Sequence, residues 1–309
     1  MKVLIKNIAL FSIALFFTVL FVFSFLTFKA EWISATNIRY KPTCKGKLSE
    51  RYFEAQNTQK KDILFLGSSH CYRGFDNRIF HEAGYTSFNW GSSSQTPIQS
   101  ALLLKEYSHR IQPKIIVLEI FPDLYNGNGL ESTLDFISNT GSNPISNEMT
   151  LRTNDVSAYN TWLYHQMHQL FKNQKAVECD TALEAYIPGG YVEKLQFLPQ
   201  KKFIPQRIHL SWNDNQLQAI KDIQNMSELQ HCKLIFVLAP MTPEYYDQYD
   251  NMEMWLKELE PYCDTIINFN PIGDVYKSSH FYDPHHLNQD GVEIFNHQLI
   301  PILKKEFPL

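Results

Sequence analysis

The sequence predicts an α/β protein, a three-layer sandwich in which a parallel sheet lies between two layers of helices, preceded by a transmembrane helix. Short continuous apolar runs such as ILFL (63–66) and KLIFVL (233–238) alternate with helix-type patterns. Strands that read this way are typical of parallel sheets covered on both faces. A third observation, an uncharged apolar run over 8–28, predicts the membrane helix.

The composition bounds the class of protein. The chain has 309 residues, of which 44% are hydrophobic, and a net charge of -4. This length allows one large globular domain with a proper core. No basic block or stripe appears in the sequence, so we expect no nucleic-acid partner.

The N-terminus predicts a membrane anchor over 1–29. Lys2 and Lys6 precede the apolar run, which is longer than a typical signal-peptide core and is followed by no small-x-small cleavage site. Lysines before the run favour a cytoplasmic N-terminus and an extracytoplasmic body, anchored by a single pass in the cytoplasmic membrane. Basic residues beyond the run oppose that orientation: Lys29, Arg39, Lys41, Lys45 and Lys47.

The rest of the chain divides into a polar stalk over 30–60 and one domain over 61–309. In that domain strands and helices alternate. We expect strands at 62–67, 86–91, 114–121, 233–240 and 265–270, and helices at 97–111, 213–229, 252–263 and 288–307. In parallel sheets ligands bind outside the carboxyl ends of the strands, so the turns after these strands should gather at one functional edge.

Between about 125 and 206 the alternation fails. This stretch is rich in Asn, Ser, Thr and aromatic residues, and contains a helical piece, YNTWLYHQMHQLF (159–171), and a glycine pair at 189–190. Loops of this length are usually functional. We therefore expect an insertion that lies over the functional edge.

The five cysteines match no zinc-site spacing. If the body is exported, one pair could be oxidised, and Cys232 with Cys263 is a plausible pair because each precedes a predicted strand. Cys71 is interpreted as a packed thiol rather than a nucleophile. We predict no metal and no cofactor, because the adjacent histidines 285 and 286 lack a helical ligand spacing.

Two segments carry the chemistry. The turn GSSH (67–70) exposes serines at the end of the first strand, and FYDPHHLN (281–288) precedes the last helix. Asp283 and His286 are three residues apart, a spacing that allows the carboxylate to hold the imidazole while the histidine faces a serine. Ser68 and Ser69 could alternatively only cap the following helix.

These segments resemble the blocks of the SGNH (GDSL-like) hydrolases. The resemblance implies a flavodoxin-like α/β/α fold and makes Ser69 the nucleophile. It also makes His286 the base, Asp283 the residue that orients it, and the amides of Ser69 and Gly91 the oxyanion hole. The membrane anchor is similar to that of exported envelope-acylation proteins, such as the D-alanyl transfer protein of teichoic-acid operons and polysaccharide O-acetylation proteins. That likeness implies a membrane-bound O-acyltransferase as a partner.

This sequence departs from the family's pattern in one block. The third strand ends VLEIFPDLYN (117–126), without the asparagine that completes the oxyanion hole, and Asp123 or Asn126 could substitute only loosely. His70 could be a second donor near the substrate or a packing residue. Glu119 could face the site or pair with a basic side chain.

The expected function is that of a membrane-tethered serine esterase or O-acyltransferase that acts on acyl esters of a cell-surface glycan. The alternative is a catalytically weak accessory protein that partners a membrane-bound O-acyltransferase in polysaccharide acylation. The sequence leaves open the acyl group, the glycan, and whether water or a sugar hydroxyl accepts the acyl group.

Overall fold

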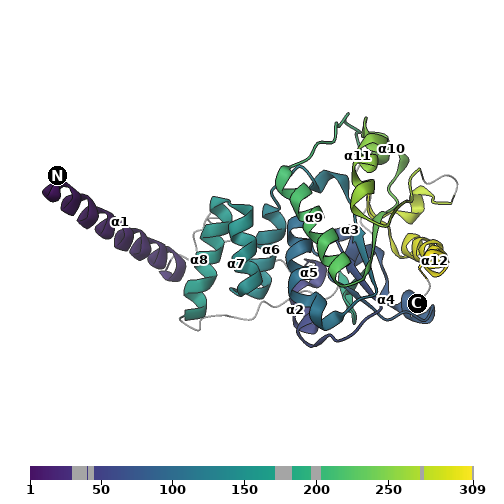
Figure 1. Cartoon of the computed structure of the whole chain (residues 1–309), viewed down its shortest axis with the longest axis horizontal. Helices are drawn as coiled ribbons and strands as arrows, with labels where there is room; N and C mark the ends of the chain where they lie inside the picture. The colour runs from purple at the N-terminus through teal and green to yellow at the C-terminus, as the bar shows by residue number, and fades with distance from the viewer. Residues whose placement is uncertain (30–39, 41–44, 171–182, 196–202, 272–274, 308–309) are drawn as a thin grey trace.

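The fold is shown in Figure 1 as a computed structural model, which describes residues 1–29, 40, 45–170, 183–195, 203–271 and 275–307. Five parallel strands form the main sheet in the order β2-β1-β3-β6-β7. They are β1 (Ile63–Leu66), β2 (Ser87–Asn89), β3 (Ile115–Glu119), β6 (Lys233–Leu238) and β7 (Thr265–Asn268). The predicted parallel sheet is confirmed, and its order is that of flavodoxin-like folds, in which ligands bind where the winding reverses beside β1.

Helices cover both faces of the sheet. Successive side chains of a strand point to opposite faces, and β1 divides its side chains in this way. Leu64 and Leu66 join one apolar cluster, and Ile63 and Phe65 join the other. The first cluster includes side chains of α2 (Leu48–Asn57), α5 (Pro97–Ile111), α9 (Asp214–Leu229), α10 (Pro243–Tyr246) and α11 (Met252–Leu259). The second includes side chains of α3 (Ser69–Gly74), α4 (Asn77–Glu82) and α12 (Gln289–Glu306).

The segment predicted as an insertion folds into two parts. Its helices are α6 (Leu130–Thr140), α7 (Pro144–Thr153) and α8 (Val156–Leu170), and its antiparallel hairpin is β4 (Glu184–Ile187) and β5 (Tyr191–Lys194). The helices pack beside α2 and α5, away from the functional edge (Figure 1). The hairpin lies against α3, and the Asn89 amide donates to the Gly189 carbonyl at 2.7 Å. Of the described insertion, therefore, the hairpin is the part that reaches the predicted edge.

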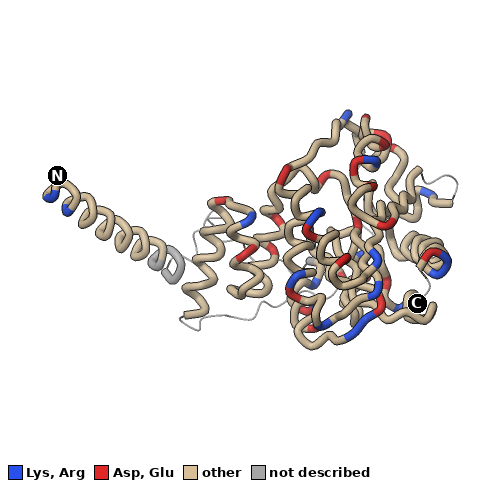
Figure 2. Tube along the Cα trace, viewed as in Figure 1, with Lys and Arg blue, Asp and Glu red and all other residues tan. Residues whose placement is uncertain are grey.

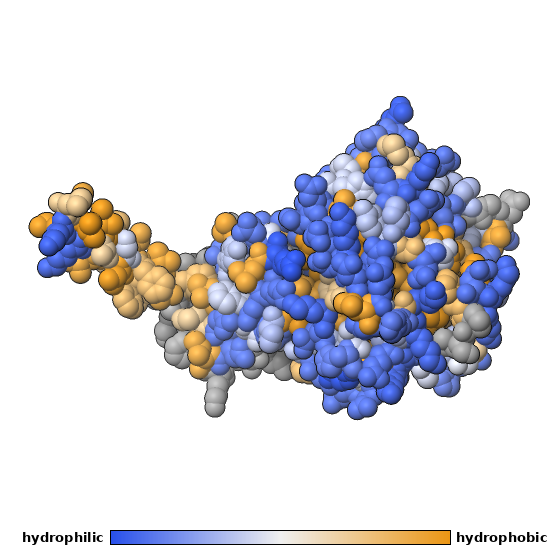
Figure 3. Space-filling model, viewed as in Figure 1, coloured by the Kyte–Doolittle hydropathy of each residue, from blue (hydrophilic) through white to orange (hydrophobic). Residues whose placement is uncertain are grey.

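The N-terminal run forms one long helix, α1 (Lys2–Lys29), that projects from the body (Figure 1). Its stretch Lys2–Phe23 is long and apolar enough to cross a membrane. Large side chains such as Phe11 and Phe21 are 68% and 72% exposed. The coloured part of the helix in Figure 2 carries its charge in the first turns, and the part coloured in Figure 3 is mostly apolar beyond them. Such a surface is consistent with a membrane-spanning helix.

The polar segment predicted as a stalk over 30–60 is partly built into the domain. Tyr40 accepts a hydrogen bond from Ser138 Oγ at 3.0 Å and donates its amide to Thr161 Oγ1 at 3.3 Å. Helix α2 packs on the core, and the buried Arg51 donates from Nε to the Gly190 carbonyl at 2.9 Å. From Lys45 onward the segment packs on the domain, because α2 contributes to the core.

The suggested Cys232–Cys263 disulfide is not formed. Both are free thiols. Their sulfur atoms face different carbonyls, that of Pro113 for Cys232 and that of Leu259 for Cys263. Cys44 and Cys179 lie outside the described residues.

Candidate active site

A sharp turn joins β1, an internal strand of the sheet, to α3. Gly67 has φ of 142°, which side-chain-bearing residues rarely adopt, and a Cβ atom there would lie 2.7 Å from Cβ of Glu119. Ser68 then caps the helix by accepting the His70 amide at 3.2 Å. Ser69 is the first residue of α3, so its side chain stands at the carboxyl edge of the sheet.

Ser69, His286 and Asp283 form a continuous hydrogen-bonded chain. Ser69 Oγ lies 2.7 Å from His286 Nε2, and His286 Nδ1 lies 2.8 Å from Asp283 Oδ2. The serine and the histidine are 217 positions apart in sequence. This is the arrangement of a serine nucleophile, its base and the carboxylate that holds the base in the correct tautomer.

The loop before α12 fixes the histidine and the carboxylate. Asp283 Oδ1 accepts the amides of His285 at 3.0 Å and His286 at 2.8 Å. The Tyr282 amide donates to the His286 carbonyl at 2.8 Å. Asn288 caps α12 by accepting the Gly291 amide at 3.1 Å. Asp283 therefore holds its own loop together as well as the imidazole.

The charges around the hydrogen-bonded residues Ser69, His286 and Asp283 would allow His286 to act as a general base. Burial lowers the pKa of His286, although the hydrogen bond that His286 Nδ1 donates to Asp283 partly opposes the shift. Burial disfavours the charge on Asp283, but the hydrogen bond with His286 and the nearby histidines hold its pKa below the ordinary value. At neutral pH His286 is thus uncharged and able to take the proton of Ser69, beside an ionised Asp283.

A second set of polar side chains lies beside Ser69, around the buried Ser68. Ser68 Oγ donates to Glu119 Oε2 at 2.7 Å, and the Ser68 amide donates to the same oxygen at 2.8 Å. Ser68 Oγ is also 3.0 Å from His70 Nδ1, and His70 Nε2 is 3.0 Å from His285 Nδ1. Ser68 is 1% exposed, so it is enclosed where Ser69 is within reach of a substrate.

The polar side chains around Ser68 contact the hydrogen-bonded chain of Ser69, His286 and Asp283. The His70 ring stacks on the His286 ring with centroids 4.4 Å apart. Burial lowers the pKa of His70 and raises that of Glu119 to about 7. Of the two alternatives for Glu119, the structure shows contact with the serine turn, and no basic side chain among the described residues pairs with it.

The three histidines 70, 285 and 286 also approach one another closely enough to hold a metal ion, with ligand atoms within 4.8 Å. His70 and His286, however, use both ring nitrogens in hydrogen bonds to protein groups. The absence of a metal stays a prediction.

The oxyanion donors are less complete than the catalytic chain. The Ser69 amide has no acceptor in the part of the chain that the structure describes. The Gly91 amide donates to Asn89 Oδ1 at 3.1 Å, so it is engaged within the protein. Asp123 accepts hydrogen bonds from Tyr245 and Tyr249 at 2.7 and 2.8 Å, which makes it an acceptor and removes it from the proposed oxyanion hole. Asn126 is exposed.

Sequence reasoning gave no site role to Asn89, Arg73 and Lys194, and it considered His285 only as a metal ligand. Asn89 is buried and donates from Nδ2 to the Cys71 carbonyl at 2.8 Å, which fixes α3 to β2. His285 bonds His70, and Arg73 and Lys194 line a pocket beside His286. Arg73 is one helical turn after Ser69, a spacing that places both on one side of α3 and could have identified it. No local signal in the sequence places Lys194.

No protein-family profile and no curated protein matches the sequence. Solved structures resemble the fold at low identity. A GDSL-like lipase from Bacteroides thetaiotaomicron is 13% identical with a TM-score of 0.43, covering 85% of this chain and 99% of the lipase. A candidate acylhydrolase from Bacteroides fragilis is 12% identical with a TM-score of 0.37, covering 91% of this chain and 97% of its own.

A candidate lipolytic protein of the G-D-S-L family from Desulfitobacterium hafniense is 11% identical with a TM-score of 0.37, and the match covers 80% of this chain and 100% of that protein. Likeness at this level carries no conclusion about chemistry. The function proposed below therefore rests on the geometry of the site.

Proposed function

We propose that the protein is a membrane-tethered, extracytoplasmic serine esterase or O-acyltransferase that acts on acyl esters of a cell-surface glycan. The observation that carries this proposal is the hydrogen-bonded chain from Ser69 through His286 to Asp283. The apolar helix α1 supports the tether, because it is long enough to cross a bilayer.

The mechanism follows from the geometry. His286 Nε2 takes the proton of Ser69 Oγ as this oxygen attacks the acyl carbonyl carbon. The amide of Ser69 donates to the developing oxyanion. The ester C–O bond breaks, and His286 returns the proton to the departing sugar oxygen, which leaves an acyl group on Ser69. Water or a second sugar hydroxyl then attacks the acyl-enzyme with His286 again as base. The bond between the acyl carbon and Ser69 Oγ breaks, and His286 returns the proton to Ser69 Oγ. Asp283 orients His286 and stabilises its charged form.

A second candidate function is that of a catalytically weak accessory protein beside a membrane-bound O-acyltransferase. The engaged Gly91 amide and the missing third-block asparagine favour it. Loss of one oxyanion donor typically lowers turnover by about 10²–10³-fold. Such a protein would hold the acceptor glycan without transferring the acyl group itself.

The test uses the full chain in detergent with an O-acetylated glycan. Released acetate and acetyl transfer to an unmodified glycan are both measured. We expect Ser69→Ala to abolish both and Asp283→Asn to reduce them by about 10⁴-fold, because the tautomer of His286 is lost. Ser157→Ala, a serine on α8, is the matched control and should retain activity.

The accessory function predicts a different pattern. The wild-type chain would be inactive alone, and acyltransferase-containing membranes would acylate the glycan equally well with wild type or Ser69→Ala. That result would reject the enzyme and leave the accessory role.

A further inference from the structure

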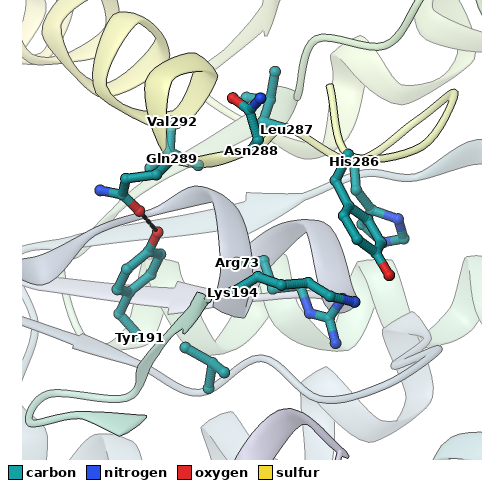
Figure 4. Close-up of a pocket in the computed structure, with 10 residues that line it drawn as sticks. Arg73, Tyr191, Lys194, His286, Leu287, Asn288, Gln289 and Val292 are labelled. Carbon is teal, nitrogen blue, oxygen red and sulfur yellow. Dashed lines mark hydrogen bonds between the residues drawn. The ribbon is translucent and has the colours of Figure 1, made fainter. Parts of the chain in front are cut away.

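A pocket opens beside His286, and its lining comes from parts of the chain that are far apart in sequence. Arg73 comes from α3, Lys194 from β5 of the hairpin, and Asn288 and Gln289 from the start of α12 (Figure 4). His286 forms one wall of the pocket, so any group bound there is next to the catalytic base.

Arg73 gives the pocket a fixed positive charge. Its Nη2 pairs with Glu184 Oε1 at 2.6 Å, and its side chain is only 14% exposed. Its Nε is buried and has no hydrogen-bond partner among the described residues. Glu184 also accepts the Gly46 amide at 2.7 Å, so this carboxylate is shared between two donors.

Lys194 adds a charge that no carboxylate among the described residues pairs with. Its Nζ lies 3.6 Å from the centroid of the Tyr282 ring. No carboxylate lies within ion-pair distance of it in the described part of the chain. Figure 4 shows Arg73 and Lys194 extending side by side below His286. With Glu184 as the carboxylate paired to Arg73, the two cations leave a net positive charge in the pocket.

A purely structural role accounts for the position of Arg73 better than for the position of Lys194. The Arg73–Glu184 pair ties the hairpin to α3. Lys194 stands at the last position of β5 and is half-buried. The lysine ammonium is a point charge on a flexible stem, so Lys194 can turn from the Tyr282 ring toward an anion bound in the pocket.

We propose that this pocket binds an anionic group of the glycan substrate, a carboxylate or a phosphate, while the ester lies at Ser69. This inference rests on the proposed function and specifies its substrate class. Both cations also lower the pKa of His286, so their charge reaches the catalytic base. Anchoring a remote anion would position the ester for attack and offset an incomplete oxyanion hole.

The test measures binding separately from turnover. The full-length Ser69→Ala chain in detergent is titrated with acetylated oligouronates, an acetylated glycerol-phosphate oligomer and a neutral acetylated gluco-oligosaccharide of the same length. We expect at least one anionic ligand to bind about tenfold more tightly than the neutral one. We also expect this preference to fall with added salt, since salt screens partly exposed charges.

Matched variants assign the effect to the pocket. Lys194→Gln should remove most of the preference, and Lys194→Arg should restore it because the charge returns. Lys60→Gln, the same change at an exposed position, should leave the preference intact. Binding of the oligouronate alone identifies a carboxylate, and binding of the phosphate oligomer alone identifies a phosphodiester.

Equal affinity for charged and neutral ligands, or a preference unchanged by Lys194→Gln, would overturn the inference. Labelling of the wild-type chain by a fluorophosphonate is measured in parallel. Absent labelling counts against the proposed catalytic function, and intact labelling without anion preference counts against the anionic subsite.

Discussion

His286 is enclosed at the candidate site, and under the proposed function this enclosure sets the pH at which Ser69 would be activated. Burial lowers the pKa of His286 below its ordinary value of 6.5. The protonated form is inactive as a base, so the rate should rise with pH and level off once the imidazole is neutral. We expect the rate of fluorophosphonate labelling to reach half of its plateau below pH 6.5. A midpoint above pH 7 would show that the charge of Asp283 outweighs burial.

Glu119 makes a second residue-scale prediction. Burial raises the pKa of Glu119 from 4.5 to about 7. Between these two pH values the folded state therefore holds a proton that the unfolded chain has lost. The contribution of Glu119 to stability must then fall as pH rises from about 4.5 to about 7. The free energy of unfolding of wild type minus that of Glu119→Gln should decrease over this interval, by at most about 3 kcal/mol. Denaturant titrations at pH 5 and pH 8 measure it, and a difference that is constant or increases with pH contradicts it.

The hairpin β4–β5 is the element that brings Lys194 to the site. Gly190 has φ of +100°, and a Cβ atom there would lie 2.1 Å from the Asn89 carbonyl oxygen. Gly84 has a similar φ of +95° with nothing within 4 Å, so it is the matched control for backbone strain alone. We expect Gly190→Ala to cost at least about 2 kcal/mol more stability than Gly84→Ala, because it also forces the hairpin off β2. Equal losses in thermal unfolding would show that the hairpin tolerates the displacement.

Helix α5 was predicted from the sequence, whereas the strands of the β4–β5 hairpin were not. The helix predicted over 97–111 matches α5, because Pro97 at its first turn and a capping box between Thr96 and Gln99 mark its start locally. The hairpin was not predicted as strands. Each of its strands has four residues with mixed burial, and docking on α3 and β2 stabilises them more than their own pattern does.

The candidate site likewise combines residues that local sequence signals mark with residues that only tertiary contacts bring together. A serine at the strand end and the three-residue spacing of Asp283 and His286 are local signals, whereas the choice of Ser69 over Ser68 came from the resemblance to the SGNH blocks. The contact between Ser68 and Glu119 spans 51 positions and depends on the pairing of β1 with β3. The pocket with Lys194 requires the docked hairpin, a tertiary arrangement that no sequence pattern fixes.

At the scale of the whole molecule, an apolar helix is attached to a polar α/β body. Lys2 and Lys6 are the charges of α1 before its apolar stretch, which favours a cytoplasmic N-terminus. We therefore expect a reporter that is active only after export to be active when fused after the last residue. A silent export reporter, together with an active cytoplasmic reporter at the same position, would reverse the orientation and remove a cell-surface glycan as substrate.

The central claim is that Ser69 is a nucleophile activated by His286 and Asp283. The most direct measurement is peptide mapping of the full-length chain in detergent after reaction with a fluorophosphonate at pH 7.5. The account predicts one adduct, on Ser69, that disappears in Ser69→Ala and is reduced at least about 10³-fold in His286→Ala. An adduct on Ser68, or equal labelling of wild type and Ser69→Ala, would contradict it.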